Sequence, residues 1–366
     1  AQFFGARDDK SANQGLHNAC ALALAAGALL TVIGIALTPA MLRLMNTPED
    51  IIGDSVIYLR IYFAGIVFVL IYNMGSAILR ATGDSKRPLY YLIVCCGINI
   101  VLDILFVLGF RMGVTGAAVA TLIAQAVSAL LVILKLMRSR GILSLSPGQI
   151  RFHTPMLRSQ LRLGLPTGFE SILFAITNIA IQSAVNTFGT DASAAWSAFG
   201  KLDAIFWMVS TAFGISITTF VGQNYGAGKM DRVRKSTRVC LLMDLVVSTL
   251  LVVFLIIARV FLFRLFTPDA EVIRIGCDML LLITPWYVIY VFIEVLAGSL
   301  RGMGNVIVPV VITLAGVCIM RIIWLAVVMK VSPTLSAIIF SYPVTWILTA
   351  LAFILYYISK ERQYSG

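Results

Sequence analysis

LYYLIVCCGINIVLDILFVLGF, residues 89–110, is an apolar stretch in which Asp103 is the only residue charged at neutral pH. A helix needs about 20 residues to cross the hydrocarbon core of a bilayer, and this stretch is long enough. The rest of the chain has the same character, because 60% of its 366 residues are hydrophobic and only 12% are charged. A soluble domain carries about 25% charged residues. The sequence therefore predicts an all-α, polytopic membrane protein and excludes a soluble protein or a conventional enzyme.

About ten such stretches are expected to span the membrane. They lie at 17–38, 56–79, 89–110, 114–137, 163–188, 196–221, 236–258, 276–300, 306–330 and 334–358. Turn signals separate them, among them Asn46-Thr47-Pro48 and Ser332-Pro333.

The basic residues of the loops predict the orientation of these spans, because loops rich in Lys and Arg stay on the cytoplasmic side. One side holds 19 Lys and Arg and the other holds 7, while two more lie within spans. The richer side consists of the N-terminal stretch, the loops at 80–88, 135–162 and 226–238, the turn at 301 and the C-terminus. We therefore expect a cytoplasmic C-terminus.

Several classes of function are disfavoured by the same residues. The net charge of +11 is spread over short loops beside apolar stretches, so it does not indicate nucleic-acid binding. The six cysteines lie in or beside apolar stretches without the spacing of a zinc site or a disulfide framework. The loop Gly226-Ala227-Gly228-Lys229 is not a nucleotide-binding P-loop, since Met230 follows the lysine where Ser or Thr is required.

The chain contains an internal repeat at an offset of 221 residues. QFFGA at 2–6 matches QNYGA at 223–227, and RATGD at 80–84 matches RGMGN at 301–305. The second copy holds six spans, and an even number keeps both copies in one orientation. We therefore expect two six-helix bundles related by a pseudo-two-fold axis along the membrane normal.

The repeat also predicts the division of the chain. Residues 1–137 should form an incomplete N-terminal lobe of four helices, 138–162 a basic cytoplasmic linker, and 163–366 a C-terminal lobe of six helices. Extending the offset backward from residue 162 places the start of the first copy about sixty residues before Ala1, which leaves room for two helices. We therefore expect about ten helices to be present out of twelve.

Five motifs at these separations together resemble the multidrug and toxic compound extrusion (MATE) transporters of the bacterial type. They are AQFFGA (1–6), LRATGD (79–84), NIVLD (99–103), GLP (164–166) and GQNYGA (222–227). The resemblance runs from Gln2 to the last helix and departs from the family in lacking the first two helices. It implies a bacterial inner-membrane transporter that is driven by Na⁺ or H⁺, without other cofactors or nucleotide, and that exports small organic cations. We expect a monomer.

Ionisable residues inside spans are costly and mark cavities or ion pathways. Asp103 follows Asn99 by one helical turn, so both lie on one face. Their oxygens would suit Na⁺, and the carboxylate could carry H⁺ instead. By resemblance, the cation site of the N-terminal lobe includes Asn73, Asn99, Asp103 and Thr121, without an Asp that the family places on its first helix. The alternative is that Asn99 and Asp103 form a hydrogen bond that only packs helices.

Three acidic residues of the C-terminal lobe are candidates for ion or substrate binding. Glu170 follows Pro166 by one turn, and Glu294 occupies the repeat position of Asn73. The resemblance suggests that acidic residues in these two helices bind ion or substrate, and burial of a carboxyl group favours the protonated form that can exchange with a cation. Asp203 is the third candidate. Pairing of the two glutamates with Arg321 or Lys201, or of Asp203 with Lys201, is the structural alternative.

The leading hypothesis is a secondary antiporter in which Na⁺ or H⁺ enters as an amphipathic organic cation leaves, while two lobes rock in alternation. A flippase for lipid-linked precursors would need a strongly cationic cleft, and mid-span basic residues are scarce. The short loops disfavour a receptor or scaffold that does not transport. An inactive truncated fragment is a fourth possibility. The exported compound, the aromatic residues that contact it and the choice between Na⁺ and H⁺ stay open.

Overall fold

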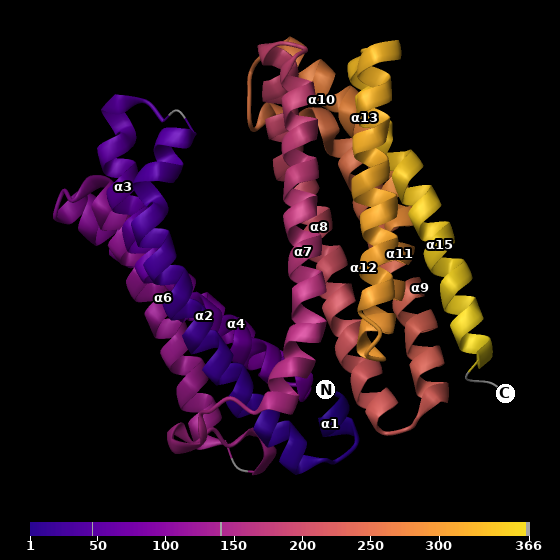
Figure 1. Ribbon diagram of the computed structural model, residues 1–366. Coiled ribbons are helices and arrows are strands. Elements are labelled where there is room, and N and C mark those ends of the chain that lie inside the picture. Colours follow the sequence, from indigo (N-terminus) through magenta and orange to yellow (C-terminus); the bar gives the residue numbers. More distant parts are fainter. Residues whose placement is uncertain (46, 140, 364–366) are drawn as a thin grey trace. The chain divides into compact units, whose positions relative to one another are not determined.

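The structure is a computed structural model that describes residues 1–45, 47–139 and 141–363 (Figure 1). Within these ranges the chain is helical and contains no strand. Nine of the described helices are long and apolar enough to cross a membrane, and one bent pair can supply a tenth span. The predictions of an all-α polytopic membrane protein and of about ten spans are confirmed. Asn46, Arg140, the last three residues and the side chains of Ile142, Arg362 and Gln363 lie outside the described part.

The chain divides into two compact units, and the boundary between Leu161 and Arg162 lies at the C-terminal end of the expected linker. The first unit runs from Arg7 to Leu161 and therefore includes most of that linker. Its helices are α2 (Asp9–Leu44), α3 (Glu49–Ala64), α4 (Ile66–Ala81), α5 (Lys86–Asp103) with the π-helical η1 (Ile104–Gly109), α6 (Gly113–Arg138), the short turns η2 (Gly141–Leu143) and η3 (Pro147–Gln149), and the beginning of α7 (Thr154–Asn186).

The second unit combines residues 1–6 with the chain from Arg162 onward. It contains α1 (Gln2–Gly5), the rest of α7, α8 (Thr190–Gly226), α9 (Met230–Arg264), α10 (Ala270–Ile283), η4 (Thr284–Trp286), α11 (Tyr287–Gly302), α12 (Ile307–Thr313), the π-helical η5 (Leu314–Ile319), α13 (Met320–Val331), α14 (Leu335–Ile339) and α15 (Ser341–Gln363). Its main core includes Phe206, Tyr287, Trp346 and Phe353.

The expected continuous span at 56–79 is a bent pair of helices. α3 and α4 meet at Gly65 with a bend of 40°. A Cβ on Gly65 would lie 2.7 Å from Cδ1 of Leu122, so the absence of a side chain permits close contact with α6 at the bend. The corresponding span of the second unit changes from α10 to α11 through a 3₁₀ turn that contains Pro285, which lacks an N–H group for the helix.

The boundaries of the helices confirm the internal repeat. α4 and α11 begin and end 221 residues apart, and so do the first residues of α3 and α10 and of α5 and α12. Gly83 and Gly304, at equivalent positions after α4 and α11, have φ angles of +94° and +87°. In each copy the N–H group after this glycine donates to the carbonyl five residues earlier, at 3.0 Å. Both helices therefore end in the same glycine-dependent cap.

The second unit contains a reciprocal crossing of the two QxxGA motifs. A Cβ on Gly5 would lie 1.9 Å from the carbonyl oxygen of Gln223, and one on Gly226 would lie 2.1 Å from that of Gln2. The side chain of Gln2 also donates from Nε2 to the carbonyl oxygen of Gly302 at 2.8 Å. Because Gln2 and Gly5 are the repeat equivalents of Gln223 and Gly226, α1 and the end of α8 cross with local two-fold symmetry.

This crossing predicts that Gly226→Ala is destabilising. The added methyl group must displace the backbone of α1, and overpacking of this kind costs about 1–3 kcal/mol. Gly200→Ala is the matched control, because Gly200 lies in the same helix with no atom within 4 Å of an added Cβ. We expect thermal unfolding in detergent to give a lower midpoint for Gly226→Ala and an unchanged or higher one for Gly200→Ala. Equal midpoints for the two variants would show that the crossing carries no tight contact.

Candidate cation and substrate sites

The first unit brings together two of the expected cation ligands. Nδ2 of Asn99 on α5 donates to Oγ1 of Thr121 on α6 at 3.4 Å, and Thr121 donates to the carbonyl oxygen of Ala117 at 3.0 Å. This contact between helices uses the amide nitrogen of Asn99. In this arrangement the amide oxygen of Asn99 points elsewhere and can accept a ligand or a proton donor.

Asp103 lies one turn further along the same face of α5, at the junction with the π-helical segment η1. Its Oδ1 is buried and has no hydrogen-bond partner among the described residues. A π-helical segment inserted in an α-helix is frequently associated with a functional site. The packing alternative expected a hydrogen bond that involves Asn99 and Asp103, whereas Asn99 donates to Thr121 and Asp103 takes no part in that bond.

Asn73, the fourth expected ligand, lies on α4 and is exposed. Within the described ranges no hydrogen bond joins it to Asn99, Asp103 or Thr121. The structure thus gathers the ligands contributed by α5 and α6 and leaves the one from α4 without a direct contact to them.

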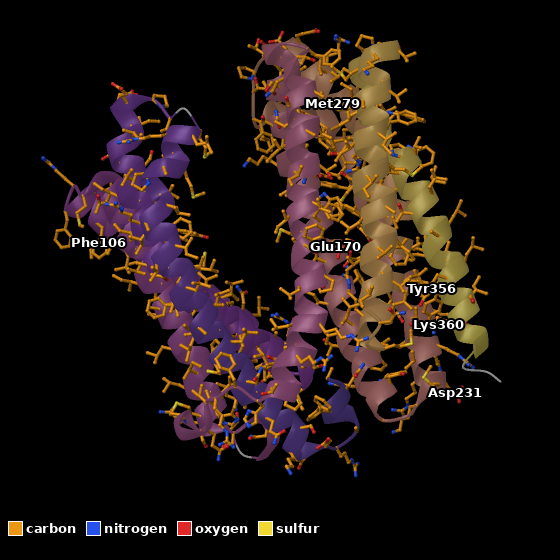
Figure 2. The ribbon with its side chains drawn as sticks, in the orientation of Figure 1. Phe106, Glu170, Asp231, Met279, Tyr356 and Lys360 are labelled. Carbon is orange, nitrogen blue, oxygen red and sulfur yellow. The ribbon has the colours of Figure 1, made fainter. Side chains whose placement is uncertain are left out.

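In the second unit, Glu170 on α7 is paired with Arg301 on α11 (Figure 2 labels Glu170). The Glu170 side chain is almost completely buried, and its Oε2 lies 3.3 Å from Nη2 of Arg301. The structural partners expected for Glu170 were Arg321 and Lys201, but the cation that pairs with it is Arg301. Its place at the end of α11, 131 residues from Glu170, gives no pairing signal in the sequence.

Glu294 precedes Arg301 by seven residues on α11, so both side chains lie on one face of the helix. Glu294 also packs against α8, where a Cβ on Gly214 would lie 2.1 Å from its Oε1. Glu170 is therefore paired with Arg301, and Glu294 lies on the same face of α11 as this arginine.

Asp203 belongs to a separate, aromatic environment. Nε1 of Trp207 donates to its Oδ2 at 2.6 Å, and the hydroxyl group of Tyr287 donates to its Oδ1. Lys201 is exposed and forms no ion pair with a described residue, so Asp203 is held by aromatic donors. The mid-span cation Arg321 is buried, with its guanidinium 3.9 Å from the ring centre of Tyr342.

Asp244 on α9 is a further carboxyl group within a membrane span, and its sequence position indicates a residue close to the cytoplasmic interface. It is completely buried, and its Oδ1 accepts a hydrogen bond of 3.0 Å from Ser248. Its Oδ2 has no partner among the described residues. In the sequence, Asp244 lies about two helical turns from the basic stretch 232–238, which is typical of a residue at the membrane interface. Only the packing of the helices shows that it is enclosed.

The described residues contain no group of three or more His, Cys, Asp or Glu side chains that could hold a metal ion. A cation at Asp103 would therefore depend on one carboxylate together with amide, hydroxyl and carbonyl oxygens. That donor set suits a hard monovalent cation or a proton better than a transition metal.

The MatE family model matches residues 1–105 and 166–328. The chain belongs to the MATE family of transporters. It is 30% identical over 321 residues to the probable multidrug resistance protein YoeA of Bacillus subtilis (strain 168), covering 86% of this chain and 69% of that protein. It is also 30% identical over 288 residues to the probable multidrug resistance protein YpnP of the same strain, covering 79% of this chain and 64% of the relative.

A solved structure of a MOP superfamily transporter from Pyrococcus furiosus Vc1 has the same fold. It superposes with a TM-score of 0.92 at 20% sequence identity, covering 98% of this chain and 81% of that one. At this identity the likeness establishes the MATE fold alone. Together with the apolar helices, family membership shows that this is a multi-pass membrane protein.

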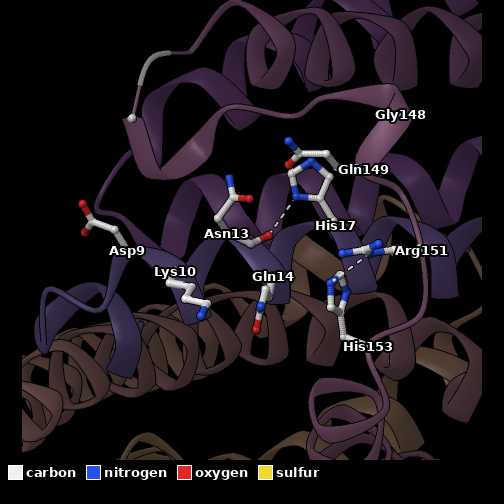
Figure 3. A pocket seen from close by; sticks show the side chains of 10 residues that line it. Asp9, Lys10, Asn13, Gln14, His17, Gly148, Gln149, Arg151 and His153 are labelled. Atoms are coloured by element: carbon white, nitrogen blue, oxygen red, sulfur yellow. Dashed lines mark hydrogen bonds between the residues drawn. The ribbon is translucent and has the colours of Figure 1, made fainter.

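The first unit of this MATE protein also has a polar pocket of about 590 Å³, between the beginning of α2 and the linker (Figure 3). His17, at its inner side, is buried and makes two hydrogen bonds. Nδ1 pairs with the carbonyl oxygen of Asn13 at 2.9 Å, and Nε2 pairs with the backbone N–H of Ser146 at 3.1 Å. These partners require Nδ1 to donate and Nε2 to accept, so the ring is a neutral imidazole that fastens the linker to α2.

Asn18 fastens the other end of the linker. Its Nδ2 donates to Oε1 of Gln160 at 2.7 Å, and its Oδ1 accepts from the N–H of His153 at 2.8 Å. Asn18 is completely buried. Both hydrogen bonds therefore replace water that cannot reach these groups.

We expect Asn18→Ala to destabilise the first unit by about 1–3 kcal/mol, because the groups that it leaves are unpaired. Gln14→Ala is the control, because Gln14 lies one turn away on the same helix and its side chain forms no hydrogen bond in the described part of the chain. Limited trypsin digestion, read at the linker residues Arg151 and Arg158, measures the effect. Faster cleavage is expected for Asn18→Ala only, and the same rate in both variants would contradict the role of Asn18.

Proposed function

We propose that this chain is a cation-coupled secondary antiporter that exports amphipathic organic cations or drugs. Its relatives YoeA and YpnP carry the name of probable multidrug resistance proteins. The observation that carries the coupling is the carboxyl group of Asp103, which lies inside a membrane span with a buried oxygen that has no partner in the described structure. An ionised carboxylate without a partner is unstable in apolar surroundings, so a coupling ion, Na⁺ or H⁺, bound at Asp103 would offset this cost.

The oxygens around Asp103 support exchange between these two states. Asn99 and Thr121 hold each other through nitrogen and hydroxyl groups, which leaves lone pairs of the amide and hydroxyl oxygens available. A cation that reaches Asp103 from one side of the membrane would neutralise it. In alternating access, release of the cation on the other side of the membrane would leave Asp103 charged again. The state without a bound cation would then be higher in free energy.

The second unit supports a role in binding the exported cation. Glu170, Glu294 and Arg301 carry a net charge of −1 when all three are ionised, and Arg301 is ion-paired with Glu170. An organic cation that approaches Glu170 competes with Arg301 for it, so binding and displacement of the arginine would be coupled. The aromatic side chains Trp207, Tyr287 and Tyr290, which pack around Phe206 in the same unit, could contact flat cations.

The flippase alternative needs a basic residue that can reach a lipid phosphate, and the described structure offers less support for it. Arg321 is the mid-span cation that a phosphate of a lipid-linked precursor would contact. It is 2% exposed, donates to Oγ1 of Thr345 at 3.0 Å and lies against Tyr342. The described structure thus gives Arg321 an internal role, and export of cations is better supported than transfer of a phosphorylated lipid. We also propose insertion in a bacterial inner membrane with a cytoplasmic C-terminus, on the distribution of basic loop residues.

Asp103→Asn should abolish efflux that depends on an ion gradient, because the amide can neither bind a proton nor neutralise a cation. Asp54→Asn is the control, since Asp54 lies exposed on α3 in the same unit. Efflux of a fluorescent organic cation from proteoliposomes, with a Na⁺ gradient and an H⁺ gradient imposed in turn, measures the effect and chooses the ion. Undiminished efflux by Asp103→Asn under both gradients would remove this residue from the mechanism.

Glu170→Gln should weaken binding of an aromatic monovalent cation by about 10- to 30-fold, which corresponds to about 1.4–2 kcal/mol for one lost charge-assisted contact. Glu271→Gln is the control, because Glu271 pairs with Arg274 on the exposed face of α10. Equilibrium binding of the fluorescent cation to the protein in detergent gives the two constants. If Glu170→Gln binds the cation as tightly as the control does, Glu170 serves only its ion pair with Arg301.

A further inference from the structure

An apolar groove runs along the surface between α8 and α9 in the second unit, with a volume of about 600 Å³. One wall is the face of α8 that carries Phe213, Ser216, Ile217 and Phe220, and the other is the face of α9 that carries Val239, Cys240 and Met243, residues spaced by three and four positions. Phe220, Val239 and Met243 are exposed by 48%, 45% and 55%. The described structure therefore leaves this groove open.

One end of the groove is basic. Arg232 and Lys235, in the first two turns of α9, line the same groove and are both exposed. Neither forms an ion pair with a described residue. Asp231 (labelled in Figure 2) belongs to the same helix end but does not line the groove. The α9 N-terminus has no side-chain cap, so the backbone adds a partial positive charge at this end.

The other basic residues of this helix end are arranged differently. Nη2 of Arg238 lies 3.1 Å from Oε1 of Glu361, and Nε of Arg234 lies 3.7 Å from the same oxygen. Of four basic residues within two turns, two are directed to a carboxylate of α15 and two are directed to the groove. A ligand that neutralises Arg232 and Lys235 must therefore be anionic, which excludes the exported organic cation as the natural occupant.

The length of the groove fits one leaflet of a bilayer. Arg232 and Met243 are 11 residues apart in one helix, which is about 16 Å at 1.5 Å per residue, close to half of the roughly 30 Å hydrocarbon core. The basic end belongs to the loop at 226–238, which the charge distribution places on the cytoplasmic side, where anionic lipid attracts such segments.

We propose that this groove binds one anionic phospholipid, with its phosphate at Arg232 and Lys235 and an acyl chain along Phe220, Val239 and Met243. Charge and shape act together, because a free phosphate would leave the apolar walls uncovered and a neutral lipid would leave two cations unpaired. The long stems of arginine and lysine can cover apolar surface while their charged ends reach the headgroup layer.

The test compares two double variants that remove the same charge from the same helix end. Arg232→Gln/Lys235→Gln alters the groove, and Arg234→Gln/Arg238→Gln alters the side that faces Glu361. Native mass spectrometry of the purified protein counts bound phosphatidylglycerol, with phosphatidylcholine of identical chains as reference. At about 1 kcal/mol per basic residue, the groove variant should bind phosphatidylglycerol about 30-fold more weakly, and the control should keep most of its affinity.

Two further arms separate lipid from other ligands. Val239→Trp, which fills the groove and keeps both cations, should also lose the lipid, and circular dichroism checks that each variant is folded. Glycerol phosphate, which has the headgroup without chains, should not compete. Equal loss in the two double variants, retention of the lipid by Val239→Trp, or full competition by glycerol phosphate would each overturn the proposal.

Discussion

A charged side chain inside this protein needs a partner, because the bilayer core offers no water to solvate it. An isolated charge in hydrocarbon costs several kcal/mol, and backbone groups are subject to the same constraint, which is why the described residues are helical almost throughout. The buried ionisable groups meet this constraint in different ways. Asp203 accepts from Trp207 and Tyr287, and Arg321 lies on Tyr342 and contacts Thr345. Asp103 has no such partner for Oδ1 among the described residues.

The repeat explains how a short sequence motif can be used twice in one architecture. The QxxGA motif ends one helix in each copy, and the two ends cross so that each glycine lies against the backbone of the other copy's glutamine. Such a contact requires glycine at both positions, which a single-copy analysis would interpret as simple helix caps. The copies are not identical beyond these turns. The π-helical segment follows Asp103 in one copy of the span and precedes Arg321 in the other, so the same span carries opposite charges at different depths along its length.

Much of the fold could be predicted from the sequence because it depends on local composition. The apolar stretches, their number and the 221-residue offset are all visible in single segments, and the structure reproduces them. The bend at Gly65 was missed because one glycine in a long apolar stretch is compatible with a straight helix. The pairing of Glu170 with Arg301 was missed for another reason. Arg301 belongs to a turn motif, and only the packing of α11 against its neighbours brings its side chain to α7. The enclosure of Asp244 likewise depends on packing and not on local sequence.

The contrast between the candidate sites supports a division of labour within the proposed function. A carboxyl group without an internal cation changes its charge state whenever a proton or cation is lost, and the energy of the surrounding span changes with it. A carboxylate that already has an arginine beside it can respond to a competing cation by exchanging partners. Asp103 is of the first kind and Glu170 of the second. Under the proposed function, the first unit would therefore respond to the coupling ion, and the second unit would respond to the charge of the exported molecule, because a substrate that displaces Arg301 separates it from Glu170.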